Sequence, residues 1–239
     1  FFVRPACHMD HIAIPPWIGR SMQRHEDPPL VRGEGRFAAD VSFPHQLHMR
    51  VVRSQVAHGI IRTIDLAPAL AMPGVVAVWS FADVADVPPI DFRLTRIAGL
   101  DPYRQTVLAK DRVRYVGDPI AVVFATDPYL AEDAAEAIEP DIDELPVCLD
   151  ATAPPVAFDD THSCEPAIVE KRYGELDAAF AGAAHVIELE LSVGRHSGVP
   201  LETRGAIARL DTARDILELH GAAKVPHWNR DTIARMLGR

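Results

Sequence analysis

The stretch VRYVGDPIAVVFATDPYLAEDAAEAIE, residues 113–139, decides the fold class because it changes from strand to helix patterning within a short span. Residues 113–116 and 120–125 are rich in β-branched and aromatic side chains, which favour strands. Gly117-Asp118-Pro119 lies between them and is typical of a turn. The first half of the stretch therefore predicts two strands joined by a turn.

A helix over residues 128–139 is predicted to follow these strands. Asp127 suits its N-cap and Pro128 suits its first position. At helical spacing the apolar side chains form one stripe, made of Leu130, Ala131, Ala134, Ala135 and Ile138. The acidic run from Glu132 to Glu144 begins on the opposite face, so it indicates a solvated helix face rather than paired catalytic carboxylates.

The residues before this stretch extend the same unit. Residues 48–53 and 75–80 read as strands, and residues 65–72 read as a short helix between them because Pro68 and Pro73-Gly74 punctuate its ends. Strands and helices without a regular β-α-β alternation predict an α+β domain over residues 33–149.

The flanking composition suggests the domain limits. Residues 1–32 are Pro-rich and lack a period, so they predict an extended N-terminal segment. Residues 150–170 carry Pro154-Pro155 and Pro166 and predict a linker. A second, α+β unit is expected over residues 171–239.

Two elements open this second unit. Residues 174–184 predict a helix whose inward side chains are Leu176, Ala179, Phe180 and Ala183. Residues 186–193 alternate and predict a strand. Its apolar face consists of Ile187, Leu189, Leu191 and Val193, and its polar face of Glu188, Glu190 and Ser192.

Further elements complete it. Residues 206–210 and 216–220 flank a polar turn and predict a hairpin. Residues 228–237 predict a last helix, with Gly238 as its stop.

Composition limits the possible partners. The chain has 239 residues and a net charge of −10, which argues against nucleic acid or an anionic membrane as the main partner. No apolar run approaches the length of a membrane span. Its three cysteines, Cys7, Cys148 and Cys164, are far apart, so the chain is expected in the cytoplasm. Because it starts at Phe1 and stops at Arg239 after a helix end, both ends are expected to be cuts in a longer protein.

Three local patterns contain side chains that could bind a metal, a substrate or another ligand. Residues 7–11 hold one thiol and two imidazoles, but no distant cluster completes four ligands, so no metal site is predicted. A break after a strand carries Glu202 and Arg204, which form either an ion pair around the turn or a substrate-proximal site. Lys224 and His227 lie between a strand and a helix, where connections often present groups to ligands.

The ordered motifs resemble the large, molybdopterin-binding subunit of the xanthine dehydrogenase/aldehyde oxidase family, in particular its bacterial carbon monoxide dehydrogenase-like members. The resemblance covers roughly residues 20–239 and rests on the number and order of its pieces. These are RHEDP (24–28), GEGRFAAD (33–40), LHMRVVRS (47–54), AHG (57–59), MPGVVAV (72–78), VRYVGDPIA (113–121), AEDAAE (131–136), ELDAAFAGAAHV (175–186) and PLETRG (200–205).

The resemblance implies an α/β hammerhead domain over residues 33–149, followed by the beginning of a molybdenum-cofactor-binding domain. It implies oxidative hydroxylation of an aldehyde, an N-heterocycle or a related substrate, or oxidation of carbon monoxide. It also implies a molybdenum-molybdopterin cofactor in its cytosine dinucleotide form, and an iron-sulfur subunit and an FAD subunit as partners. The family's main cofactor loop and catalytic glutamate would lie beyond Arg239, so residues 1–239 alone are not expected to turn over.

One departure from the family concerns Lys224. It stands where many members carry a Gln two residues before the Pro-His pair, so the resemblance implies a catalytic position for Lys224 and substrate-proximal positions for Glu202, Arg204 and His227. A lysine donates hydrogen bonds but accepts none, so it cannot replace both functions of an amide.

Two other hypotheses stay open. One is a non-catalytic hammerhead-type binding or assembly module. The other is a stand-alone metal-binding protein that uses His8 and His11.

Overall fold

A computed structural model describes residues 17–92, 95, 97–194, 196–200 and 202–239. It divides the chain into two compact units, each built from separate stretches. One unit joins the described residues up to Ser42 with Val199–Ala222. The other joins Phe43–Gly198 with Ala223–Arg239. Both units mix helices and strands, which confirms the predicted α+β class.

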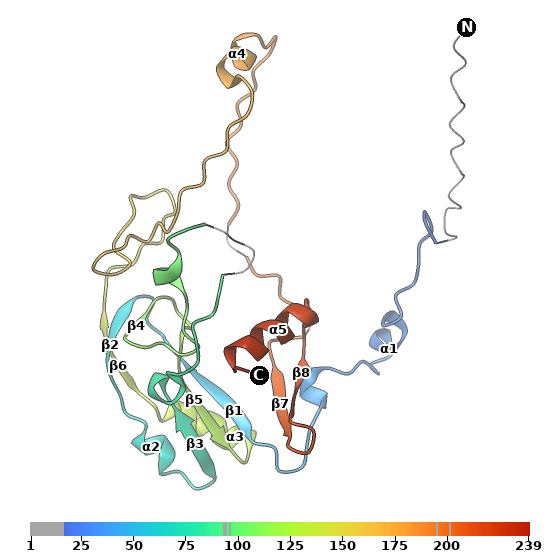
Figure 1. The fold of residues 1–239 in the computed structure, drawn as a ribbon, viewed down its shortest axis with the longest axis vertical. Helices are drawn as coiled ribbons and strands as arrows, with labels where there is room; N and C mark the ends of the chain where they lie inside the picture. The colour runs from blue at the N-terminus through green and yellow to red at the C-terminus, as the bar shows by residue number, and fades with distance from the viewer. Residues whose placement is uncertain (1–16, 93–94, 96, 195, 201) are drawn as a thin grey trace. The chain divides into compact units, whose positions relative to one another are not determined.

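An antiparallel sheet in the larger unit contains the predicted strands (Figure 1). Its order is β1 (His48–Arg53), β5 (Pro119–Ala125), β3 (Val75–Trp79), with β5 in the centre. The central strand is apolar on both faces, and Ile120 and Val123 are fully buried. Burial of such a strand between two others and a helix supplies the main apolar core of the unit.

Helix α3 (Pro128–Glu136) packs on this sheet. The Asp127 carboxylate accepts hydrogen bonds from the Tyr129 and Leu130 amides, so the predicted N-cap is confirmed. Ala131 and Ala134 are buried, as the predicted stripe requires. The helix ends at Glu136, three residues earlier than predicted, because the chain then turns into a strand.

A second sheet has the order β4 (Arg112–Val113), β2 (Gly59–Ile64), β6 (Pro140–Glu144). The sequence analysis did not predict β2 or β6. Part of the acidic run therefore belongs to a strand, β6, rather than to the helix face. In β2, a Cβ on Gly59 would come within 2.8 Å of the Asp143 carbonyl oxygen, so the close approach of these strands requires glycine.

The two strands predicted around Gly117 are β4 and β5, but β4 ends at Val113 instead of Val116 and the two strands belong to different sheets. β4 pairs with β2, whereas β5 pairs with β1 and β3, so the turn carries the chain from one sheet to the other. Gly117 has φ +95°, and its amide donates to the Ser54 carbonyl at 2.8 Å. Ser54 in turn donates its amide to the Asp118 carbonyl at 2.9 Å, which fixes the crossing point.

The segment predicted as a linker is anchored to the larger unit through Phe158. Arg112 and Arg114 donate hydrogen bonds to the Phe158 carbonyl at 3.0 and 2.9 Å, and the Arg114 guanidinium lies 3.4 Å from the Phe158 ring centroid. The Tyr103 ring packs on the same phenyl ring, and its hydroxyl donates to the Ser163 carbonyl at 2.8 Å. We call this arrangement the Phe158 clasp.

The predictions for residues 174–193 are wrong in two respects. Helix α4 is only Leu176–Ala181, and the supposedly inward Leu176 and Phe180 are 67% and 58% exposed. Residues 186–193 form no strand in the structure. Among the described residues no strand pairs with this segment, and without a paired strand an extended chain has no ladder of hydrogen bonds.

The smaller unit is built around the predicted hairpin. Strands β7 (Ala206–Asp211) and β8 (Ile216–Gly221) pair antiparallel. The Asp211 carboxylate closes the turn by accepting from the Ala213 and Arg214 amides. Helix α1 (Asp27–Val31) belongs to the same unit, within a segment predicted as extended.

Short helical elements complete the description. Helix α2 (Ala67–Leu70) lies within the predicted range, and the 3-10 turns are η1 (Ala38–Asp40), η2 (Phe81–Val84) and η3 (Asp101–Tyr103). Among the described residues, no helix combines the length and the apolar character needed to cross a membrane.

Helix α5 (Pro226–Met236) closes the chain. The Gly238 amide donates to the Arg235 carbonyl, and the Arg239 amide donates to the Ala234 carbonyl. Gly238 has φ +64°, so these bonds form a Schellman motif and confirm Gly238 as the helix stop.

Candidate functional site

Lys224 lies in the short connection that precedes α5. Its side chain is exposed, and within the described part of the chain it has no hydrogen bond or ion pair. Val225 follows at the N-cap, where its apolar side chain accepts no hydrogen bond from the helix. The connection therefore presents an ammonium group close to the positive end of a helix dipole. Such a surface attracts an anionic group.

His227 occupies the first turn of α5 and is exposed. The helix starts at Pro226, two residues earlier than predicted, because proline suits the first helical position. Lys224 thus lies two residues before the first residue of α5, and His227 is the second residue of the helix.

Glu202 has a partner that the sequence did not indicate. Its Oε1 atom accepts a hydrogen bond from the Ala38 amide at 3.0 Å, across 164 positions of sequence. The carboxylate thereby caps η1, and this bond ties the N-terminal segment to the start of the hairpin. Of the two alternatives for the turn, an ion pair between Glu202 and Arg204 is not formed among the described residues: Glu202 accepts from the Ala38 amide instead, and Arg204 is exposed.

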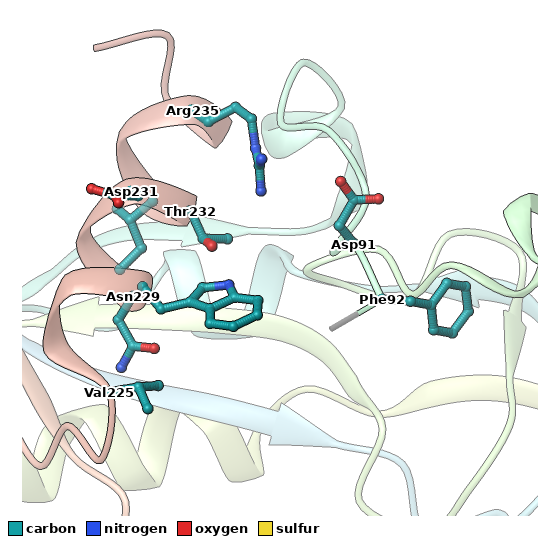
Figure 2. A pocket seen from close by; sticks show the side chains of 9 residues that line it. Asp91, Phe92, Val225, Asn229, Asp231, Thr232 and Arg235 are labelled. Atoms are coloured by element: carbon teal, nitrogen blue, oxygen red, sulfur yellow. The ribbon is translucent and has the colours of Figure 1, made fainter. Parts of the chain in front are cut away.

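A hollow of about 690 Å³ lies beside α5 in the larger unit (Figure 2). Asp91 and Phe92 form one side, and Arg235 extends from the helix on the other. Asp91 is already paired with Arg104 at 3.1 Å. The remaining lining residues are Val225, Trp228, Asn229, Asp231, Thr232 and Ile233. The four predicted site residues do not line this hollow, although Val225 directly follows Lys224.

Asp159 and Asp118 are two of the carboxyl groups whose pKa values are shifted from the usual range. The pKa of Asp159 is held well below its usual range, first by the Thr161 amide and further by hydrogen bonds from His162. Burial raises the pKa of Asp118, although the Arg114 amide donates to its Oδ2 at 3.0 Å. Both groups hold turns in place, at the Phe158 clasp and at the crossing between the sheets.

No group of three or more His, Cys, Asp or Glu side chains in the described ranges is arranged to hold a metal ion. The Cys7–His11 stretch, including His8 and His11, lies outside the described residues.

Two family models match the chain in sequence order. The aldehyde oxidase and xanthine dehydrogenase a/b hammerhead domain matches residues 32–146. The molybdopterin cofactor-binding domain matches residues 160–239. This order of domains is that of a molybdopterin-binding large subunit. The chain belongs to the xanthine dehydrogenase/aldehyde oxidase family, as its motifs predicted.

Individual relatives agree with this assignment. The gamma subunit of the 6-hydroxypseudooxynicotine dehydrogenase complex of Paenarthrobacter nicotinovorans is 41% identical over 92% of this chain and 29% of its own length. The carbon monoxide dehydrogenase large chain of Hydrogenophaga pseudoflava is 31% identical over 89% of this chain and 28% of its own length. The chain therefore spans less than a third of the length of these relatives.

A solved structure agrees as well. Quinoline 2-oxidoreductase from Pseudomonas putida 86 superposes with a TM-score of 0.76 at 35% identity, over 91% of this chain and 28% of that one. The hammerhead domain followed by a cofactor-binding domain, expected from the motifs, is thus confirmed.

Proposed function

We propose that this chain is part of the catalytic, molybdopterin-binding subunit of a molybdenum hydroxylase. The observation that carries the proposal is the ordered match of a hammerhead domain and a molybdopterin cofactor-binding domain within one chain. As an oxidoreductase of this class, the complete protein would convert R–H and water into R–OH, two protons and two electrons.

The proposed substrate is an electron-poor N-heteroaromatic ring. Relatives at 41%, 35% and 34% identity carry names that refer to 6-hydroxypseudooxynicotine, quinoline and nicotine. The carbon monoxide dehydrogenase large chain of Hydrogenophaga pseudoflava is less similar, at 31%. This ranking favours a heterocycle over carbon monoxide.

The donors near α5 suit an anionic cofactor group. Lys224 offers an ammonium that is not paired among the described residues, and His227 offers an imidazole in the first helical turn. When bound, a molybdenum-pterin group would supply the two-electron redox chemistry. Lys224 would donate a hydrogen bond to it, to a charged intermediate or to a substrate carboxylate, and so stabilise negative charge.

The other candidates take supporting positions in this proposal. His227 and Arg204 are exposed and would lie near the substrate in the complete protein. Glu202 would act through its bond to the Ala38 amide, which sets the position of the turn that carries Arg204.

Electron removal requires further carriers. We propose an iron-sulfur subunit and an FAD subunit as partners, the cytosine dinucleotide form of the pterin and a cytoplasmic location. The relative described as the gamma subunit of a complex supports a multi-subunit assembly. Residues 1–239 alone are not expected to turn over, because they span less than a third of these relatives.

The test uses the full-length protein purified with its partners. It is incubated with a panel of pyridine- and quinoline-type rings, an aldehyde and carbon monoxide in H₂¹⁸O, with an artificial electron acceptor. The proposal predicts a hydroxylated heterocycle that carries ¹⁸O. Turnover of carbon monoxide alone would contradict the substrate class, and no turnover of any compound would contradict the reaction class.

A further inference from the structure

The hollow beside α5 combines two aromatic side chains with charged groups. Trp228 and Phe92 line it and are 39% and 41% exposed. Its volume of about 690 Å³ lies in the range of sites that bind small molecules. A flat aromatic ring is the ligand that this lining favours, because it can stack on the indole or on the phenyl ring.

The wall of the hollow across from α5 is held by contacts of its own (Figure 2). The Ile90 amide donates to the Gln105 carbonyl at 2.8 Å, within an isolated antiparallel bridge. The Asp91 carboxylate, which comes next, pairs with Arg104 at 3.1 Å. The same arginine pairs at 2.8 Å with Asp101, whose side chain is 85% exposed. The adjoining phenyl ring of this wall is therefore positioned before any ligand binds.

Helix α5 supplies the other wall with one of its faces. Trp228, Thr232 and Arg235 are separated by four and three residues, and this spacing places them on the same side of a helix. All three line the hollow. Long side chains on a helix lean toward its N-terminus, so the Arg235 guanidinium extends from the last turn toward the level of Thr232.

Arg235 is the unpaired charged group of this wall. Asp231 pairs with the preceding residue, Arg230, at 2.7 Å, and Asp91 is paired as described above. Within the described part of the chain, the Arg235 side chain forms neither a hydrogen bond nor an ion pair. A guanidinium can bind a carboxylate through two parallel hydrogen bonds, so this free cation suits an anionic group on a ligand.

We propose that Arg235 is a specificity-determining residue that binds a carboxylate carried by a planar heteroaromatic substrate, while Trp228 and Phe92 hold the ring. The inference rests on the proposed function, because it takes the ligand of the hollow to be the N-heteroaromatic substrate of that function. It extends that function by assigning the substrate an anionic substituent, where a ring alone leaves the substituent open.

Binding of a matched pair of probes to the full-length protein tests this charge preference. Quinoline-4-carboxylate and quinoline-4-carboxamide share one ring system and differ in the charge of the substituent. In isothermal titration calorimetry the carboxylate is expected to bind at least about tenfold more tightly, which one charge-assisted hydrogen bond can supply. Equal affinities, tighter binding of the carboxamide, or binding of neither probe would overturn the proposal.

Variants assign the preference to a residue. Arg235→Gln is expected to weaken binding of the carboxylate about tenfold and to leave binding of the carboxamide unchanged. Arg235→Lys keeps the positive charge and is expected to retain part of the preference. Arg32→Gln is the matched control, because Arg32 is an exposed arginine of the smaller unit, and it is expected to retain the full preference. A full preference in Arg235→Gln would overturn the assignment.

Chemical modification tests the same residue without a substitution. This matters because Arg235 lies in the last turn of α5, where a basic side chain also stabilises the helix. Phenylglyoxal modifies exposed guanidinium groups, and mass spectrometry locates the modified residues. Quinoline-4-carboxylate is expected to slow the modification of Arg235 and to leave that of Arg32 unchanged. Equal rates at Arg235 with and without the carboxylate would overturn the proposal.

Molybdenum content and turnover of the same preparation decide the proposed function separately. Preferential binding of the carboxylate by a protein that holds no molybdenum and hydroxylates no ring would overturn the proposed function and leave the Arg235 site standing. Hydroxylation of rings without a preference for the carboxylate would overturn the Arg235 site alone. In the active protein, Arg235→Gln is expected to raise KM for the carboxylate about tenfold with kcat unchanged, because the contact is made equally in the ground state and the transition state. A loss confined to kcat would contradict a role in substrate binding.

Discussion

Lys224 is the residue on which the proposed chemistry depends most. Its ammonium is exposed beside the start of α5 and is unpaired among the described residues, so it is available to stabilise a negative charge. Because a lysine accepts no hydrogen bond, its contribution would be electrostatic. This distinguishes it from the glutamine that the family resemblance places at the same position.

Replacing Lys224 by Ala in the complete enzyme is expected to lower kcat/KM about 100-fold, in line with the loss of one positioned electrostatic donor. Steady-state kinetics with the identified substrate measure the effect. Lys171→Ala serves as the matched control, because Lys171 is also an exposed lysine. An unchanged rate in Lys224→Ala would remove this residue from the site.

Ionisation of the Asp159 carboxyl group is expected to stabilise the folded protein. Hydrogen bonds from Thr161 and His162 hold its pKa below the unfolded value, so the ionised form is preferred in the folded protein. The stabilisation is therefore present above the unfolded pKa of about 4 and is lost as pH falls through the lower folded pKa.

Asp159→Asn is accordingly expected to lower the melting temperature at pH 7. The difference from wild type should shrink when the pH is lowered below about 4, because the wild-type carboxyl then loses its advantage. Thermal unfolding at several pH values measures both effects. Asp160→Asn is the control, since Asp160 is the exposed neighbour. Equal losses for the two variants at pH 7 would contradict this account.

For single residues, the sequence predicted those structural roles that depend on hydrogen-bond partners a few positions away in the chain. The N-cap Asp127 and the stop Gly238 were correct, because both act on amides or carbonyls within a few positions. The bond between Glu202 and Ala38 could not be predicted, because only the folded chain brings the two positions together. Whether Arg204 and His227 meet a substrate stays a prediction.

At the scale of elements, α3 and β5 were predictable because their patterns are strong and their partners lie within the same domain. β2 and β6 were missed because their short, partly charged sequences show little alternation. Residues 186–193 show the opposite case. Their alternation is clear, yet a strand exists only where another backbone completes its ladder.

The Phe158 clasp anchors residues 150–170, which their composition predicted to be a linker, to the larger unit. Phe158→Ala would remove the ring from its contacts with Tyr103 and Arg114. Because the ring is half-buried, the loss in free energy of unfolding is expected to be about 2 kcal/mol, below the range for a fully buried phenylalanine.

Denaturant unfolding of the variant measures this loss. Tyr129→Ala is the matched control, because Tyr129 is an aromatic residue that is 79% exposed on α3. A loss in Phe158→Ala no larger than that in Tyr129→Ala would mean that the clasp does not stabilise the fold.

At the scale of the whole molecule, the chain divides into two units and belongs to the xanthine dehydrogenase/aldehyde oxidase family. The class of protein was predictable because many short motifs occur in a fixed order. The discontinuous make-up of the units was not, because residues before Ser42 join the hairpin of residues 206–221 only in three dimensions. The proposed hydroxylase function requires that the complete protein bind the molybdenum-pterin cofactor.

The most direct test is the molybdenum content per chain of the full-length protein, measured by elemental analysis after gentle purification from its native host. The proposed function predicts a ratio near one. A ratio near zero, in a folded protein from a host that makes the cofactor, would contradict it and would favour a non-catalytic binding or assembly module.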